Sequence, residues 1–217
     1  MRVSLLGFQF LTVGPLIDGD LELISPDASL IEEVLRSCEH PLTRLQAPSD
    51  AEVTRQQLQH FLLAAPNGHE EPDPLMGRVA QYHFWLQLRS GFVGKPGAPP
   101  IRMLGGIGLR IGSSHAIEQY YGHLGYHVFP AARGRNYAQR ACRLLLPLAK
   151  AHGIDPLWIT CNPDNVASRT TCERLGAEFH GIVPVPPTDP LYLRGEHEKC
   201  RYRLDLSATP ALKHSFD

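Results

Sequence analysis

One turn combines small and basic residues in a pattern that suits anion binding. A predicted strand ends at Val128 and Phe129, the chain turns through small residues, and a helix pattern starts at about Gly134. The free N–H groups and the dipole of a helix start attract negative charge. Arg133 and Arg135 add two cations, so phosphate or pyrophosphate is the expected ligand. An ordinary helix start with solvated arginines is the alternative, and this segment alone does not separate the two.

A second polar segment follows the next predicted strand along the chain. Asn165 precedes a short helix pattern that reaches Leu175 and ends at Gly176. Capping this helix is the ordinary role of Asn165. Its side-chain amide could also contact a ligand that lies between the two strands that lead into these helices.

Together the two segments resemble the GNAT superfamily of acyl-CoA-dependent N-acetyltransferases. The family's loop signature, Arg/Gln-x-x-Gly-x-Gly/Ala, is similar to Arg133–Ala138, and its second block is similar to Asn165, Ala167-Ser168 and Leu175-Gly176. The 27 residues from Ala138 to Asn165 are enough for one helix and one strand. Two flanking segments resemble a branch of predicted bacterial acetyltransferases: Gly122–Tyr126 and Thr160–Asn165.

The resemblance implies an α/β fold, more exactly described as α+β, with a mixed sheet whose central parallel strands splay apart between flanking helices. The pantetheine arm of acetyl-CoA would lie in the gap, against the backbone of Val128 and Phe129. Asn165 and Ser168 would contact the pantetheine or the phosphate side. Backbone amides would hold the pyrophosphate at Arg133, Gly134, Arg135, Asn136, Tyr137 and Ala138.

Two positions depart from the family pattern. Asn136 stands where the loop signature usually has Gly, and Asn tolerates strained backbone better than most residues. Cys172 stands where many members have the Tyr that protonates the leaving thiolate. A thiol with a pKa of about 8.5 could still donate that proton. The alternative, which the residue type favours, is a small buried hydrophobe.

The residue that removes the proton from the amine is less evident. Relatives often carry Glu or His on the strand face equivalent to Gly122 and Leu124, and both positions are apolar here. A bulge could turn His123 inward, which makes His123 the candidate base and Cys172 the candidate acid. His123 and His127 could instead form a metal pair, but no third ligand is evident, so no metal is expected. A water molecule or a neutral amine would remove the need for a base.

The resemblance predicts an acyltransferase that moves the acetyl group of acetyl-CoA directly to an amine. The alternative is a catalytically weak or inactive module that only binds acyl-CoA. A nucleotide-binding α/β protein is the third interpretation, and the chain lacks both GxxxxGK[ST] and a first-strand GxGxxG.

Composition limits the partners and the compartment. The 217 residues carry a formal net charge of −1, which gives no general field for nucleic acid or an anionic membrane. Five widely spaced cysteines without CxxC favour a reducing cytoplasm. The apolar stretch Met1–Ile17 is broken by polar residues and is too short to span a bilayer. The expected partners are acetyl-CoA and the amine of a small molecule, peptide or protein, and a homodimer is compatible with this scheme.

The resemblance implies a single GNAT-like domain over 1–217, with its best-matched core at 80–206 and an N-terminal extension at about 1–15. Strands are expected at 21–24, 82–88, 101–111, 121–129, 157–161, 179–185 and 200–206. Helices are expected at 29–38, 49–64, 134–151 and 165–175.

Overall fold

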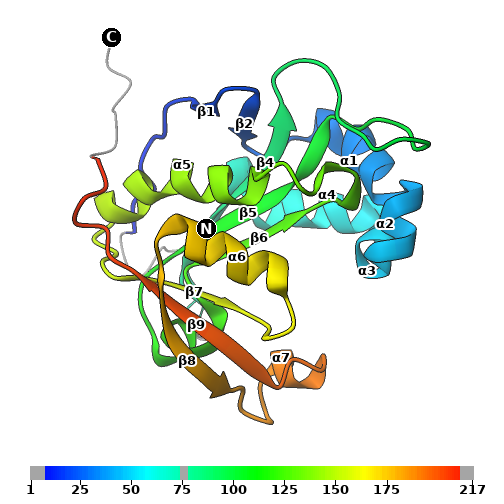
Figure 1. Ribbon diagram of the computed structural model, residues 1–217. Coiled ribbons are helices and arrows are strands. Elements are labelled where there is room, and N and C mark those ends of the chain that lie inside the picture. The colour runs from blue at the N-terminus through cyan, green and yellow to red at the C-terminus, as the bar shows by residue number, and fades with distance from the viewer. Residues whose placement is uncertain (1–7, 74–77, 211–217) are drawn as a thin grey trace. The chain divides into compact units, whose positions relative to one another are not determined.

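The chain folds into two compact units, and a computed structural model describes residues 8–73 and 78–210 (Figure 1). The first unit takes the described parts of Met1–Gly108 and Tyr126–Tyr137. The second takes Leu109–Gly125 and the described part of Ala138–Leu212. Strands β5 (Met103–Ile111) and β6 (Leu124–Val128) contribute residues to both units.

The first unit is built on strands in the hydrogen-bonded order β1-β2-β4-β5-β6. These include β1 (Leu16–Asp18), β2 (Leu21–Ile24) and β4 (Ala80–Leu88), and the short β3 (His69–Glu70) also pairs with β4. Strand β2 runs antiparallel to β4, with Leu21 opposite Leu88. Buried residues occur at every second position of β2, and nearly every residue of β4 and β5 is buried, so β4 and β5 form the centre of the core.

Four helices follow β2 in the first unit: α1 (Ile31–Cys38), α2 (Pro41–Gln46), α3 (Pro48–Ala51) and α4 (Arg55–Ala64). In Figure 1, α4 passes behind the strands of this unit, and α1, α2 and α3 lie to their right. Helix α1 buries Ile31 and Val34, and the Ser37 hydroxyl donates to the Met103 carbonyl of β5 at 2.9 Å. A capping box between Thr54 and Gln57 starts α4.

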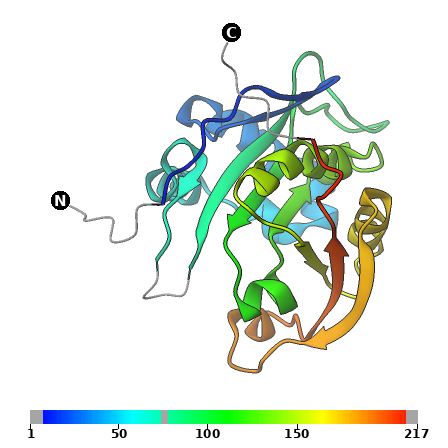
Figure 2. The ribbon, with the colours of Figure 1, turned by 90° about the vertical axis from the view of Figure 1, so that its left-hand side faces the viewer.

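The second unit has the order β5-β6-β7-β9-β8. Strand β7 (Leu157–Cys161) runs antiparallel to β9 (Glu198–Leu204), which pairs with the edge strand β8 (Glu178–Pro184); Figure 2 shows β8 and β9 side by side. Helices α5 (Tyr137–Ala151), α6 (Val166–Leu175) and α7 (Pro190–Leu193) accompany these strands. Strands β6 and β7 are parallel, and their register pairs one residue of each, Leu124 with Ile159.

The expected mixed sheet with flanking helices is confirmed. Most of the expected bounds lie within two residues of those observed, and three elements differ more. The strand expected from 121 begins at Leu124, because a π-helical turn, η4 (Ile117–Tyr121), and a left-handed Gly122 come first. The helix expected from 134 begins at Tyr137. The helix expected over 49–64 is two helices, α3 and α4, because Thr54 caps a new one.

Some elements were not expected from the pattern: β1, β3, α2, η4 and α7. Each has six residues or fewer, so none repeats its hydrophobic period often enough to be recognised. The N-terminal extension expected at about 1–15 lies partly outside the described residues, and β1 begins at Leu16. Within residues 8–73 and 78–210, no helix has the length and apolar character that crossing a membrane requires.

Candidate functional site

The turn between β6 and α5 is open to solvent and carries two left-handed residues. A short 3-10 turn, η5 (Pro130–Ala132), is buried, whereas the following residues from Arg133 to Asn136 are exposed. Gly134 has φ 90° and Asn136 has φ 59°. Left-handed residues in a tight turn are typical of backbone in which successive N–H groups point toward one anion. This geometry supports the anion site expected from the sequence.

Side-chain contacts hold the turn at both ends. The Arg133 Nε donates to the Val128 carbonyl at 2.9 Å, which folds the loop back onto the end of β6. Tyr137 is 4 % exposed and its hydroxyl contacts the Asp20 carboxylate at 3.1 Å, which anchors the first residue of α5. Arg135 reaches the Gly94 carbonyl at 3.5 Å. Tyr137 is therefore an anchor, while the two arginines are exposed to solvent.

At the end of β6, both backbone groups of Phe129 are used within the protein, and the Val128 N–H is directed elsewhere. The Phe129 N–H donates to the Leu104 carbonyl of β5 at 2.8 Å, and the Phe129 carbonyl accepts from Ala132 at 2.9 Å. Because backbone groups alternate in direction along a strand, the Val128 N–H points away from β5. The backbone contact that was expected at Val128 and Phe129 is thereby narrowed to Val128.

His123, the base expected from the sequence, is a buried link between β6 and β7 in the second unit. It is 2 % exposed, and the Trp158 N–H donates to its Nδ1 at 2.9 Å. The ring also makes a backbone hydrogen bond with Gly112. Burial, the largest influence, lowers its pKa and keeps the ring neutral. These contacts support a structural role for His123.

Asn165 and Ser168 lie at the start of α6 in the second unit. The Asn165 side chain accepts a hydrogen bond from the Ser168 N–H at 3.0 Å, which is the capping contact. The Ser168 hydroxyl in turn interacts with the Cys161 thiol. Asn165 is exposed and Ser168 is half-buried, so a ligand can reach Asn165. Capping uses the Asn165 oxygen and leaves its NH₂ group outside this contact.

Cys172, the expected acid, is fully buried on α6. A hydrogen bond from Cys172 is the main reason why the pKa of the Cys161 thiol falls to about 7; Ser168, Arg169 and Lys199 act in the same direction, against desolvation. Burial of Cys172 supports the alternative of a small core residue. The thiol with a lowered pKa is Cys161, which sequence reasoning missed because its partners come from α6 and from beyond β7.

The imidazole of His127 on β6 is accessible to solvent. From the sequence, His127 was considered only as a metal ligand. The residue is exposed, and its ring lies edge-on to Phe129 with centroids 5.4 Å apart. Gly106 of β5 makes room for the ring, because a Cβ there would lie 2.9 Å from the His127 Cε1. Within residues 8–73 and 78–210, no three His, Cys, Asp or Glu side chains are placed to share a metal ion.

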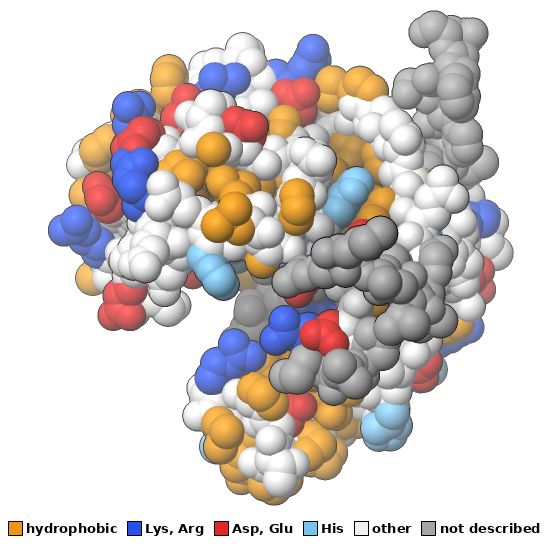
Figure 3. Space-filling model, turned by 180° about the vertical axis from the view of Figure 1, so that it is seen from behind, with side chains coloured by type: hydrophobic (Ala, Val, Ile, Leu, Met, Phe, Trp, Pro, Cys, Tyr) orange, Lys and Arg blue, Asp and Glu red, His pale blue; other side chains and the backbone are white. Residues whose placement is uncertain are grey.

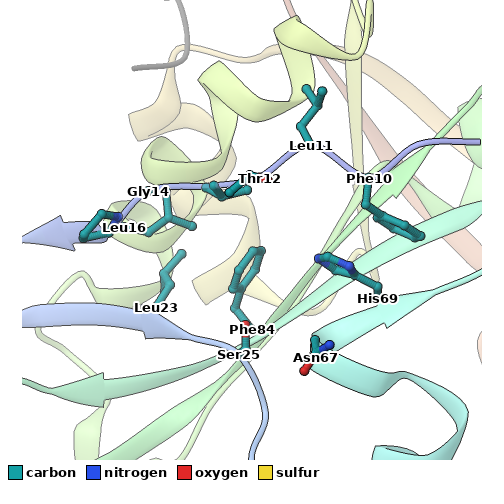
Figure 4. A pocket seen from close by; sticks show the side chains of 12 residues that line it. Phe10, Leu11, Thr12, Gly14, Leu16, Leu23, Ser25, Asn67, His69 and Phe84 are labelled. Carbon is teal, nitrogen blue, oxygen red and sulfur yellow. The ribbon is translucent and has the colours of Figure 1, made fainter. Parts of the chain in front are cut away.

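The first unit also contains two cavities. One, of about 470 Å³, is lined by residues 10–16 and by Leu23, Ser25, Asn67, His69 and Phe84 (Figure 4). Phe10 stacks on His69 there, with ring centroids 4.3 Å apart.

The other cavity, of about 520 Å³, lies between α4 and the β3–β4 pair, where His83 contacts Glu70 at 2.9 Å. Figure 3 views the side of α1–α4 and shows hydrophobic side chains grouped beside histidines. Leu45 of α2 and Leu63 of α4 are both exposed.

Comparison with known proteins decides the family. Residues 21–178 match the acetyltransferase (GNAT) domain family. The chain belongs to the GNAT acetyltransferase family. The expected family, fold and enzyme class are thus confirmed, and no curated protein sequence matches the chain significantly.

Solved GNAT structures share the fold at low sequence identity. The Microcin C7 self-immunity acetyltransferase MccE, in complex with acetyl-CoA and AMP, is 16% identical with a TM-score of 0.61, over 87% of this chain and 93% of that one. A putative ribosomal-protein-serine acetyltransferase from Vibrio cholerae is 17% identical, with a TM-score of 0.58 over 88% of this chain and 97% of its own. RimL, a ribosomal L7/L12 α-N-protein acetyltransferase in complex with coenzyme A, is 16% identical, with a TM-score of 0.59 over 88% and 98%.

Proposed function

We propose that this GNAT protein binds acetyl-CoA and transfers its acetyl group directly to the amine of an acceptor, with 1–217 working as a single domain. The observation that carries the proposal is the exposed turn from Arg133 to Asn136, with left-handed Gly134 and Asn136, at the start of α5. In a member of this family such a turn is suited to pyrophosphate.

The proposed acetyl-CoA site has three parts. Backbone amides and two arginines of the turn, Arg133–Ala138, hold the pyrophosphate. The Val128 N–H, directed away from β5, donates to the thioester carbonyl and stabilises the charge that grows on its oxygen during attack. At the start of α6, the exposed Asn165 and the half-buried Ser168 contact the pantetheine or the phosphate side. Solved neighbours that hold acetyl-CoA or coenzyme A support the choice of co-substrate.

The acceptor belongs to the broad class of amines. RimL is a ribosomal L7/L12 α-N-protein acetyltransferase, which supports a protein amine as one candidate acceptor. We propose the cytoplasm as the location, which the five buried cysteines, none of them in a disulfide, support.

A catalytically weak acyl-CoA-binding module is the second candidate. Two observations favour it: Cys172 is buried where relatives have a Tyr acid, and Gly122 and Leu124 place no ionisable group on their strand face. Such a module would bind acetyl-CoA and leave every amine unmodified.

The test is an amine panel with acetyl-CoA and a readout of released thiol. The panel contains a peptide with a free N-terminal serine, an Nα-acetylated lysine peptide and spermidine. We expect thiol release with at least one amine, and intersecting lines in double-reciprocal plots, because direct transfer requires both substrates to be bound together. Parallel lines, with an added acetyl mass on the protein after acetyl-CoA alone, would contradict direct transfer. Binding without any transfer would favour the weak module.

A further inference from the structure

We propose that His127 is the base that takes the proton from the acceptor's ammonium group during acetyl transfer. The proposal rests on the proposed function. It assigns the proton transfer to the imidazole of the second-last residue of β6. It replaces His123, whose nitrogens are occupied by backbone contacts.

The position of His127 follows from the register of β5 and β6. The Phe129–Leu104 hydrogen bond sets the pairing, and two residues back along β6 His127 lies opposite Gly106. Opposed residues of an antiparallel pair share one face, and the close approach of Gly106 to the His127 ring agrees with this. His127 therefore projects from the sheet over Gly106, in space that any larger residue would fill.

His127 is also the immediate neighbour of Val128 in the chain. Consecutive Cα atoms are about 3.8 Å apart. The Val128 N–H lies in the plane of the sheet and points away from β5, while the His127 side chain stands out of that plane. An acetyl group held by Val128 would have its carbonyl carbon beside this imidazole, and an amine that approaches from the same face would pass it.

The ring nitrogens of His127 are available for proton transfer. Among the residues that the structure describes, no hydrogen bond or ion pair reaches them, and the residue is exposed. His83 on β4 is the contrasting case, because its Nε2 is already paired with Glu70 at 2.9 Å.

The surroundings keep His127 unprotonated near neutral pH. Desolvation by the protein around the ring is the largest influence and lowers its pKa from the ordinary value. Asp50 of α3 acts against this shift, and the Arg133 cation adds to it. Gly106 brings no charge. A neutral imidazole at pH 7 is the form that can accept a proton.

The reaction balances with His127 in this role. The acceptor ammonium gives one proton to His127, and the free lone pair then forms the C–N bond with the thioester carbonyl carbon. The C–S bond breaks, and its electron pair leaves with the sulfur of CoA. The second proton lost from the amide nitrogen ends on that sulfur, and His127 returns its proton to water.

The test compares His127→Asn and His127→Gln with the unmodified full-length protein, using the three panel amines as probes. His152→Asn is the matched control, because burial also lowers the pKa of His152 while it lies beyond the last residue of α5, 15 residues from the loop end of the helix. Acetyl-CoA affinity is measured by calorimetry, folding by thermal melting, and kcat and kcat/KM from pH 5.5 to 9.5.

We expect both His127 variants to fold and to bind acetyl-CoA with a Kd within about threefold of the original, while kcat falls by about 10²–10⁴, the usual contribution of a general base. The acid limb of kcat/KM should lie below the ordinary histidine pKa of about 6.5 in the unmodified protein. In the variants this limb should be absent. Their kcat/KM should instead rise tenfold per pH unit up to the pKa of the acceptor amine.

Three results would overturn the assignment. If a folded His127 variant keeps kcat within threefold of the unmodified protein, or keeps the acid limb of its pH profile, another group is the base. A variant that loses acetyl-CoA affinity along with rate places His127 in the binding site instead. The proposed function fails separately, when the unmodified protein neither binds acetyl-CoA nor acetylates any probe.

Discussion

At the scale of single residues, Asn136 shows how backbone geometry accommodates a departure from the family signature. The position has φ 59°, in the left-handed region that usually selects Gly. Asn visits this region more readily than other L-residues because its short polar side chain bonds locally. The tolerance of Asn136 for this backbone could be predicted from its residue type. The accessible ring of His127 could not, because the space around it is created by Gly106 of another strand.

Asn136→Val should strain the turn, since a β-branched side chain at positive φ costs about 1–2 kcal/mol. We expect that loss in the free energy of unfolding, measured by urea denaturation, and weaker acetyl-CoA binding by calorimetry. Asn136→Gly is the matched control and should retain both. Equal behaviour of the two variants would show that the left-handed turn does not hold the ligand.

Cys172→Ala should raise the pKa of Cys161 above its value of about 7, because the main hydrogen bond that stabilises the thiolate is lost. The rate of alkylation by iodoacetamide rises with the thiolate fraction, so its midpoint should move to higher pH. Mass spectrometry of the Cys161 peptide measures this rate. Cys38, whose pKa burial raises to about 11, is the internal control. An unchanged pH midpoint of Cys161 alkylation would show that Cys172 does not stabilise the Cys161 thiolate.

At the scale of elements, β5 and β6 carry most of the proposed chemistry. Their hydrophobic runs predicted two strands, but the start of β6 was misplaced because η4 is a π-helical turn and leaves no period in the sequence. The start of α5 was placed three residues early, because Arg135 and its neighbours are compatible with a helix until the φ angles of Gly134 and Asn136 are known.

Gly106→Ala tests the packing between these strands. The new Cβ would lie 2.9 Å from the His127 Cε1, at the end of a side chain that can move, so we expect a displaced ring and a fall in kcat of at least tenfold with little loss of stability. Gly125→Ala is the control, because its nearest neighbour is an Arg110 nitrogen at 3.7 Å. Similar kcat values for the two variants would contradict the proposed position of the His127 ring over Gly106.

At the scale of the whole molecule, the two signature segments were sufficient to predict the family and the mixed sheet. The turn at Arg133–Ala138 and the cap at Asn165 are local features, and local features are visible in sequence. The groups that act on Cys161 come from α6 and β9, and Trp158 of β7 binds His123, so no spacing rule predicts them. The acceptor also depends on such assembled surfaces.

Calorimetric titration with acetyl-CoA, CoA and ATP shows whether the turn Arg133–Ala138 binds the co-substrate. We compare the unmodified protein with Arg133→Glu/Arg135→Glu and with a charge-matched control, Arg36→Glu/Arg55→Glu, on exposed sites of α1 and α4. We expect acetyl-CoA and CoA to bind the unmodified protein and the control, ATP to bind weakly, and the loop variant to lose at least tenfold in acetyl-CoA affinity. Unchanged acetyl-CoA affinity in a folded loop variant would contradict it.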